Sequence, residues 1–350
     1  NTTNPNKEMS IFGDFIEDVT GLIAVCLVMG LVLVAGQRIP RTKGREIKWH
    51  IIYVPIVLAS FFLMPMAAKE VVFTPLCVVV AGTVYPIYES IRAVCTVGSE
   101  DDTVWLTYWI AQGIVSFSTE WVDGIGHNVQ IHWNMFEFFF YLWLLLPWTD
   151  GATLIFDFIM APLVAPVIQP IVQKLDGLIN KLIALVMNAA HLSIVWIVFV
   201  FLDPSLKRTI WILLATVFPL GSSIVSVTTL EGGDDTYWLT YWSCFGILFL
   251  ITDFIENFIG FIPGFYTLTI AATIYLMLPL FRGAETVFRS VLVPLAGLQE
   301  MLVRRDAEDI KRQALADLPP ERRALVMKAI AESFEKEAKI QGDAKTGYQS

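Results

Sequence analysis

The chain is a series of apolar blocks separated by short polar stretches. Each of the stronger blocks approaches the roughly 17–25 residues with which a helix crosses a hydrocarbon core of about 30 Å. Four contain no Asp, Glu, Lys or Arg: Val19–Gly36, Ile51–Ala68, Leu182–Leu202 and Thr209–Val227. Five weaker ones are shorter or contain an acid: Val71–Ile87, Thr103–Val122, Trp133–Pro147, Tyr237–Ile262 and Tyr266–Phe281. The weaker blocks fit a shallow hairpin as well as a full crossing. The pattern predicts an all-α integral membrane protein.

Composition supports the membrane class. Of the 350 residues, 55% are hydrophobic and 16% are charged, whereas a soluble domain carries about 25% charged residues. Such a chain has too little polar surface to cover a soluble fold. The mean hydropathy of +0.62 agrees.

A basic loop sets the predicted orientation. Gln37–His50 carries five Lys or Arg residues against the single acid Glu46. Basic loops face the cytosol or its equivalent compartment. If the blocks alternate as hairpins, the acidic loops Ser99–Asp102 and Glu231–Asp235 lie on that same side, together with the C-terminal tail. The opposite side then receives only short turns.

One nine-residue phrase occurs twice, with a single difference. The sequence DDTVWLTYW occupies Asp101–Trp109, and DDTYWLTYW occupies Asp234–Trp242. With an offset of 133 residues, and 132 after one residue is lost in a later turn, identities extend well beyond the phrase, for example from Leu146-Pro147 to Leu278-Pro279. An even number of passages separates the copies, which therefore have the same orientation, as parallel repeats do.

The repeat predicts the domain organisation. We expect a first unit at residues 49–181 and a second at residues 182–305, each made of two hydrophobic hairpins followed by an amphipathic segment. Residues 1–48 would add an N-terminal tail, an extra helix and the basic loop. Residues 306–350 form a charged tail. In that tail Glu321–Ile340 is typical of a solvated or partner-docking helix.

The two amphipathic segments differ. Thr286–Arg305 places its apolar residues along one helical stripe: Val287, Val291, Leu295, Leu298 and Leu302. Such a helix lies either in the headgroup plane or against the protein's own helices, and the pattern leaves both open. The counterpart Gly151–Lys181 is more apolar and carries three prolines, each of which removes a backbone donor. We expect a kinked or broken segment there.

The repeated phrase predicts a helix start with an interfacial anchor. Acids and threonines at a helix start accept hydrogen bonds from first-turn amides and complement the helix dipole. Trp and Tyr rings prefer the headgroup level. The predicted cap and anchor residues are Asp101, Asp102, Thr103, Trp105, Tyr108 and Trp109 in the first copy, and Asp234, Asp235, Thr236, Trp238, Tyr241 and Trp242 in the second.

The order of these motifs resembles the TB2/DP1/HVA22 family, which includes the REEP and Yop1 proteins. The matching pieces are Tyr85-Pro86, Glu100–Trp109, Glu120, Asp123, Leu144–Pro147 and Gly151-Ala152, with counterparts in the second copy. Members of that family carry one unit, so the chain resembles a tandem duplication. The resemblance implies a multi-pass protein of the endoplasmic reticulum, or of another organelle membrane. It implies short hairpins and an amphipathic helix that wedge the cytosolic leaflet, and oligomers that scaffold curvature.

Two acid pairs are the other polar feature of the apolar blocks. Glu120 with Asp123, and Asp253 with Glu256, lie three residues apart and so on one helical face. Acids within membrane segments are candidates for a proton or ion path. Their position near the hairpin turns favours the alternative that they reach water or headgroups, or bond within the protein.

Nothing in the sequence proposes catalysis. The four cysteines and four histidines have no metal-site spacing, and no nucleotide-binding or nucleophile motif is present. We therefore expect no catalytic, cofactor-binding or metal residues and no enzyme activity. The expected partners are membrane lipids, further copies of the chain or other membrane proteins, and no nucleic acid.

Three functions remain open at this level. The first is membrane shaping or scaffolding through hairpin and amphipathic-helix geometry. The second is an accessory structural subunit of a large membrane complex in an organelle. The third, less favoured, is a transporter that uses the acid pairs.

Overall fold

The computed structural model describes residues 47–98, 100–119, 127–186, 201–228, 233–260 and 264–316, with a few single positions beyond them. All regular structure in these ranges is helical. The predicted extra helix Val19–Gly36, most of the block Leu182–Leu202 and the tail helix Glu321–Ile340 lie outside the described residues. Two compact units are present: residues 1–94 with 98–297, and residues 95–97 with 298–350.

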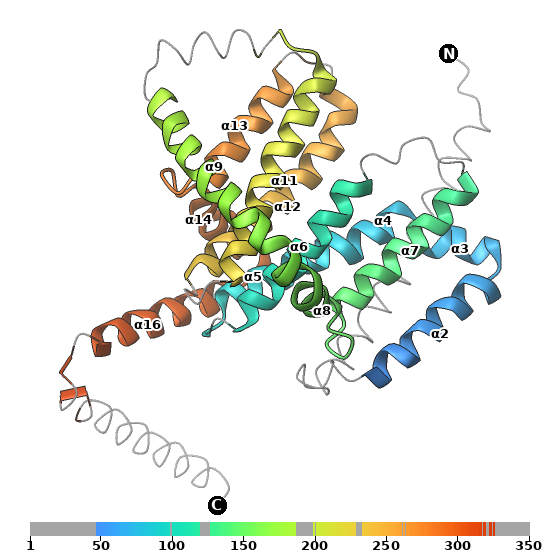
Figure 1. Ribbon diagram of the computed structural model, residues 1–350, viewed down its shortest axis with the longest axis horizontal. Helices are drawn as coiled ribbons and strands as arrows, with labels where there is room; N and C mark the ends of the chain where they lie inside the picture. The colour runs from blue at the N-terminus through green and yellow to red at the C-terminus, as the bar shows by residue number, and fades with distance from the viewer. Residues whose placement is uncertain are drawn as a thin grey trace, which may run out of the picture. The chain divides into compact units, whose positions relative to one another are not determined.

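The first unit contains both repeats (Figure 1). Its first-repeat elements are α2 (Ile47–Leu63), α3 (Met66–Val72), α4 (Pro75–Val79), η2 (Val80–Val84), α5 (Tyr85–Cys95), α6 (Glu100–Thr119), α7 (His127–Leu145), α8 (Gly151–Ile155), η3 (Phe156–Val164) and α9 (Ala165–Val186). Those of the second repeat are α11 (Pro204–Thr228), α12 (Gly233–Ile259), α13 (Phe265–Met277), α14 (Gly283–Val287), η4 (Phe288–Leu292) and α15 (Val293–Ala296). The main helix of the second unit is α16 (Gln299–Ala316), in which Arg305 pairs with Asp309 at 3.7 Å.

Several helices are long and apolar enough to cross a membrane. Within the described residues these are Pro75–Cys95, Gly151–Lys174, Ser205–Thr228 and Asp234–Glu256, and a bent pair adds a fifth if it counts as one span. The protein is thus an all-α, multi-pass membrane protein, as the hydrophobic pattern predicts.

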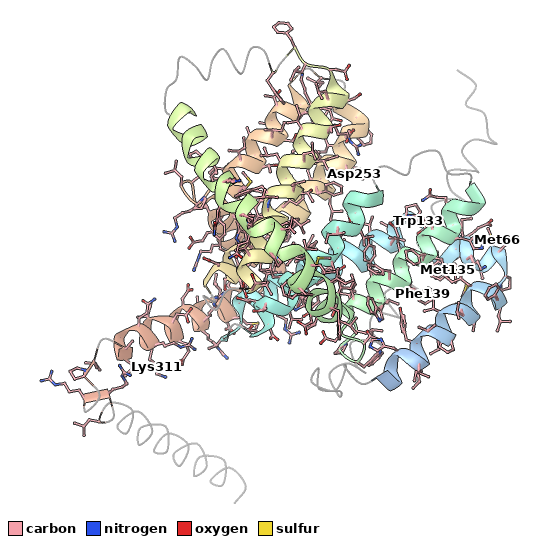
Figure 2. All side chains as sticks on the ribbon, viewed as in Figure 1. Met66, Trp133, Met135, Phe139, Asp253 and Lys311 are labelled. Atoms are coloured by element: carbon pink, nitrogen blue, oxygen red, sulfur yellow. The ribbon has the colours of Figure 1, made fainter. Side chains whose placement is uncertain are left out.

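The bent pair corrects one predicted span. The pattern predicts a single apolar helix over Ile51–Ala68, but the chain bends by 118° between α2 and α3, at Met64 and Pro65. Pro65 has no N–H, and it disfavours helical geometry at the residue before it. The segment is therefore a broken span or a re-entrant turn, and α7 packs against it through side chains that include Phe139 (Figure 2).

The proline-rich segment, predicted to be kinked or broken, is not broken, and the kink stays a prediction. The chain is helical from Gly151 to Val186 and takes up Pro162 within the π-helical stretch η3. The first 24 residues of this segment form a candidate span, so it is more apolar than a surface-lying amphipathic helix. A π-turn absorbs a residue without ending the helix.

The second amphipathic segment is also shorter than predicted. The helix ends at Ala296, because Gly297 adopts a left-handed φ of 70°, so Thr286–Arg305 is not one helix. The π-turn η4 shifts the register, so that Phe288 and Leu292 are buried while Val291 and Leu295 are 53% and 78% exposed. The predicted stripe is thus exposed at Val291 and Leu295 and buried at Leu298 and Leu302, so the choice between the headgroup plane and the protein's own helices stays open.

Both repeats enter this last segment through the same turn. Asp150 and Arg282 adopt left-handed φ angles of 45° and 48° at equivalent positions, and a glycine follows each. A Cβ on Gly283 would lie 2.1 Å from the carbonyl oxygen of Tyr275, and one on Gly151 would lie 2.7 Å from that of Trp143. Only glycine allows the helix start to approach the backbone of the preceding helix so closely.

This turn predicts that Gly283→Ala is strongly destabilising. The new methyl group meets a backbone carbonyl that cannot rotate away, so we expect a loss of about 1–3 kcal/mol in the free energy of unfolding. Thermal unfolding of the purified protein in detergent measures it. The matched control is Gly177→Ala in α9, where a Cβ meets nothing within 4 Å. A Gly283→Ala protein as stable as the control would contradict the argument.

Candidate functional site: the interface between the repeats

The doubled phrase lies where the two repeats pack on each other. Its copies form the first turns of α6 and α12, and these two helices contact each other within the first unit. Helix α6 also packs along α11. The phrase therefore belongs to an interface between the copies and not only to two separate helix starts.

Two reciprocal hydrogen bonds join the copies. Thr103 donates from Oγ1 to Oδ2 of Asp235 at 2.6 Å, and Thr236 donates in the same way to Oδ2 of Asp102. The two carboxylates are only 1% (Asp102) and 6% (Asp235) exposed. Bonds from a hydroxyl to a buried carboxylate are among the stronger hydrogen bonds in proteins. This pairing has the isologous form of a two-fold dimer interface, in which each partner offers the same group to the other.

One oxygen of the second copy has a further partner. Ser226 donates to Oδ1 of Asp235 at 2.6 Å. The equivalent residue of the first copy is Ala93, which has no hydroxyl group. The two halves of the interface are therefore alike in geometry and unequal in chemistry. Asp101 and Asp234, the first acids of each phrase, are exposed and lie outside this network.

The tryptophans that end the phrases stack across the interface. The rings of Trp109 and Trp242 lie 6.3 Å apart between centroids and 3° from parallel. Each indole also donates within its own repeat, to Ser90 at 2.8 Å and to Ser223 at 2.9 Å. These bonds hold each ring against its own repeat.

The tyrosines of the phrase bind the preceding helix of their own repeat. Tyr108 donates to the carbonyl of Gly82, and Tyr241 donates to that of Ala215, both at 2.7 Å. Trp105, Tyr108, Trp109, Tyr241 and Trp242 are all buried, and Trp238 is half-buried. Their main contacts are thus with protein. Contact with headgroups and capping of the first-turn amides remain predictions.

Two equivalent glycines lie where the repeats contact each other, and the approach at Gly246 is too close for a Cβ. A Cβ on Gly246 would lie 2.8 Å from Cδ1 of Ile87, and one on Gly113 would lie 3.5 Å from Cδ1 of Leu220. Small residues at such crossings are typical of helix packing in membranes. The two positions are equivalent in the repeats, and so are Ile87 and Leu220, so the packing follows the same two-fold relation as the hydrogen bonds.

The acids of the two predicted pairs differ in their surroundings. Glu120 and Asp123 lie outside the described residues. Asp253 is exposed near the end of α12 (Figure 2). Glu256 accepts a hydrogen bond from Tyr266 at 2.5 Å and pairs with Arg208 at 3.5 Å. The Glu256 carboxylate is thus bonded within the protein. Its position near a turn favours this alternative over an ion path.

Sequence reasoning missed one acid of α7. Glu137 lies in the middle of the block Trp133–Pro147, is half-buried and lines a cavity between the repeats. The signal that could have found it is a single carboxylate among aromatic residues of a membrane segment. Among the described residues, no group of three or more His, Cys, Asp or Glu side chains is placed to hold a metal ion.

The fold and this interface define a multi-pass membrane protein built from two parallel copies of one helical unit. The model of the TB2/DP1, HVA22 family matches residues 86–163 and 219–295, one match in each copy. The chain belongs to this family, as a tandem duplication of its unit.

Three curated relatives give the range of similarity. Protein yop1 of Emericella nidulans is 38% identical over 90 residues, which cover 25% of this chain and 52% of the relative. Receptor expression-enhancing protein 6 of Danio rerio is 32% identical over 116 residues, or 31% and 51% of the two chains. Protein YOP1 of Pyricularia oryzae is 34% identical over 132 residues, or 37% and 71%. The chain thus spans about half the length of the first two. No solved structure gives a significant match.

The network predicts that Asp235→Asn destabilises the protein, whereas Asp234→Asn does not. The amide keeps an oxygen that can accept from only one of the two hydroxyls of Thr103 and Ser226, and it lacks the carboxylate's charge. We therefore expect a loss of about 1–3 kcal/mol for the buried site and less than about 0.5 kcal/mol for its exposed neighbour. Thermal unfolding of both variants in detergent compares them. Equal stability of the two would show that the reciprocal bonds do not hold the repeats together.

Proposed function

We propose that the protein shapes or scaffolds curved membrane of the endoplasmic reticulum by occupying the bilayer unevenly. Family membership supports a structural role in a membrane and no catalytic one. The single observation that carries the proposal is the reciprocal interface of α6 and α12, because it turns two family units into one body. A rigid inclusion imposes its shape on lipid, whereas two hinged units could follow the lipid instead.

The outward-facing apolar segments supply the uneven volume. Val291 and Leu295 in the second repeat are exposed on the protein, and so are Phe158 and Leu163 in the first, at 73% and 67%. The face with Val291 and Leu295 fits insertion into the headgroup and acyl boundary. Phe158 and Leu163 belong to the candidate span Gly151–Lys174 and would contact acyl chains instead. The bent pair α2 and α3 supplies a further segment that need not cross the bilayer. Together these features support a wedge that takes more volume in one leaflet than in the other.

A second function is favoured by one observation on α16. This helix lies beyond both family matches and exposes Val303 and Ile310, at 66% and 67%. The two residues are seven apart and share a helical face. An exposed apolar pair on a charged helix fits docking to a partner protein, as a fixed subunit of a larger membrane complex would require.

The shaping proposal predicts tubules or small vesicles when the full chain is reconstituted into liposomes. Gly246→Val should weaken this activity, because the added side chain collides with Ile87 and loosens the interface. Electron microscopy at matched protein-to-lipid ratios measures the fraction of tubular membrane, and flotation shows that each variant is inserted.

The matched control for this experiment is Gly177→Val, which makes the same substitution where nothing lies within 4 Å. Liposomes that stay unchanged with the parent protein would refute the shaping function. Native mass spectrometry of the endogenous protein then tests the alternative, which requires fixed partners at constant stoichiometry.

A further inference from the structure

A cavity of about 250 Å³ lies between the two repeats. It is bounded by α4, α6, α7, α11 and α12, at the level of the stacked Trp109 and Trp242. Drug-sized ligands occupy pockets of about 300–1,000 Å³, so this space suits a smaller molecule. Neither the family match nor the proposed function accounts for it.

Aromatic rings form most of the cavity's second-repeat wall. Trp211 and Phe249 lie 6.0 Å apart at 18°, and Trp242 meets Phe245 edge-on at 6.0 Å. Trp211 is further fixed by a hydrogen bond from its indole to Thr273 at 2.9 Å. The rings are therefore held by protein contacts, and the wall does not need a ligand to form.

The first-repeat wall mixes apolar and polar residues and carries one carboxylate. Glu137 contributes that group and accepts a hydrogen bond from Trp133 one helical turn away. Gln112 and Ser116 line the same side, and Ser116 bonds to Tyr141. No Lys, Arg or His is among the described residues that line the cavity. A single carboxylate thus borders the same cavity as the aromatic rings of the second repeat.

The two walls occupy equivalent positions of the repeats. Gln112 and Ser116 correspond to Phe245 and Phe249, and Glu137 corresponds to Thr269. A homodimer would place the same residues on both sides of such a cavity. Here Gln112 and Ser116 face their different counterparts Phe245 and Phe249 across the repeats, whereas other lining pairs, such as Trp109 and Trp242, are identical.

We propose that this cavity binds an organic ammonium ion with a small apolar body. Aromatic faces attract cations through the ring quadrupole, Trp most strongly, and quaternary ammonium groups are recognised by such cages. The Glu137 carboxylate supplies the opposite charge, which is costly within a membrane protein unless it is paired. The ammonium group comes either from the choline headgroup of a lipid or from a free amphiphilic amine.

The test titrates the full-length protein in a non-ionic detergent with benzyltrimethylammonium, followed by the fluorescence of the lining tryptophans. The reference compound is neopentylbenzene, the neutral isostere in which carbon replaces the charged nitrogen. Empty micelles correct for partition of both compounds. We expect saturable binding and a preference of roughly tenfold or more for the cation.

Two variants locate the site. Glu137→Gln should reduce the affinity for the cation by roughly tenfold and leave the neutral compound unaffected, and Phe249→Leu should weaken cation binding while keeping the cavity apolar. Asp253→Asn is the control, because Asp253 is an exposed acid outside the cavity. Retained binding of the neutral compound shows that each variant is folded.

Competition with lipids shows whether the ammonium group comes from a lipid headgroup or from a free amine. Displacement by short-chain phosphatidylcholine, but not by phosphatidylglycerol of the same chain length, identifies a lipid headgroup. Displacement by neither assigns the site to a free amine. The proposal is overturned if the cation binds no more tightly than its neutral isostere, or if Glu137→Gln and Asp253→Asn bind it equally well.

Discussion

The close crossing of α6 and α12 is the contact on which the rest of the structure depends. Helices in a bilayer gain little from the hydrophobic effect when they associate, because lipid tails are as apolar as their side chains. Their association depends instead on close packing and on interhelical hydrogen bonds. Gly246 contributes to the first, because a Cβ there would meet Ile87 of α5 at 2.8 Å. The reciprocal Thr and Asp pairs provide the second. Individual interhelical hydrogen bonds in membranes average only about 0.6 kcal/mol, so the packing and the bonds must act together.

Fusion of the two units into one chain has two consequences for the interface between them. The second copy is always present at high effective concentration, so a modest interface suffices to keep the units paired. Each half can also change without changing the other. Ser226 donates a hydrogen bond to Asp235, whereas the equivalent residue of the first copy is Ala93. Phe245 lines the cavity, and its equivalent in the first copy is Gln112. In both places the contact geometry stays two-fold while the chemistry does not.

The sequence predicts the repeat, its register, the helical class and the membrane, because these follow from identity at a fixed offset and from block hydropathy. It does not predict that Thr103 bonds to Asp235, because that depends on the angle at which two helices cross. The break at Pro65 was hidden by an uninterrupted apolar block. Glu137 is visible in the sequence as a single carboxylate among aromatic residues, but the sequence does not predict the cavity that it shares with the rings of the other repeat.

The outward stripe of the last segment shows why pattern alone could not place the lipid-facing surface. A regular helix would bring Val287, Val291 and Leu295 to one face and leave its orientation open. The π-turn beginning at Phe288 adds a residue to the turn, so Phe288 and Leu292 take the inner positions and Val291 and Leu295 turn outward. The first repeat has its π-turn at the equivalent Phe156. The apolar surface offered to lipid is therefore set by a backbone irregularity that both copies share, and a change that restored regular helix there would rotate this surface inward without altering its composition.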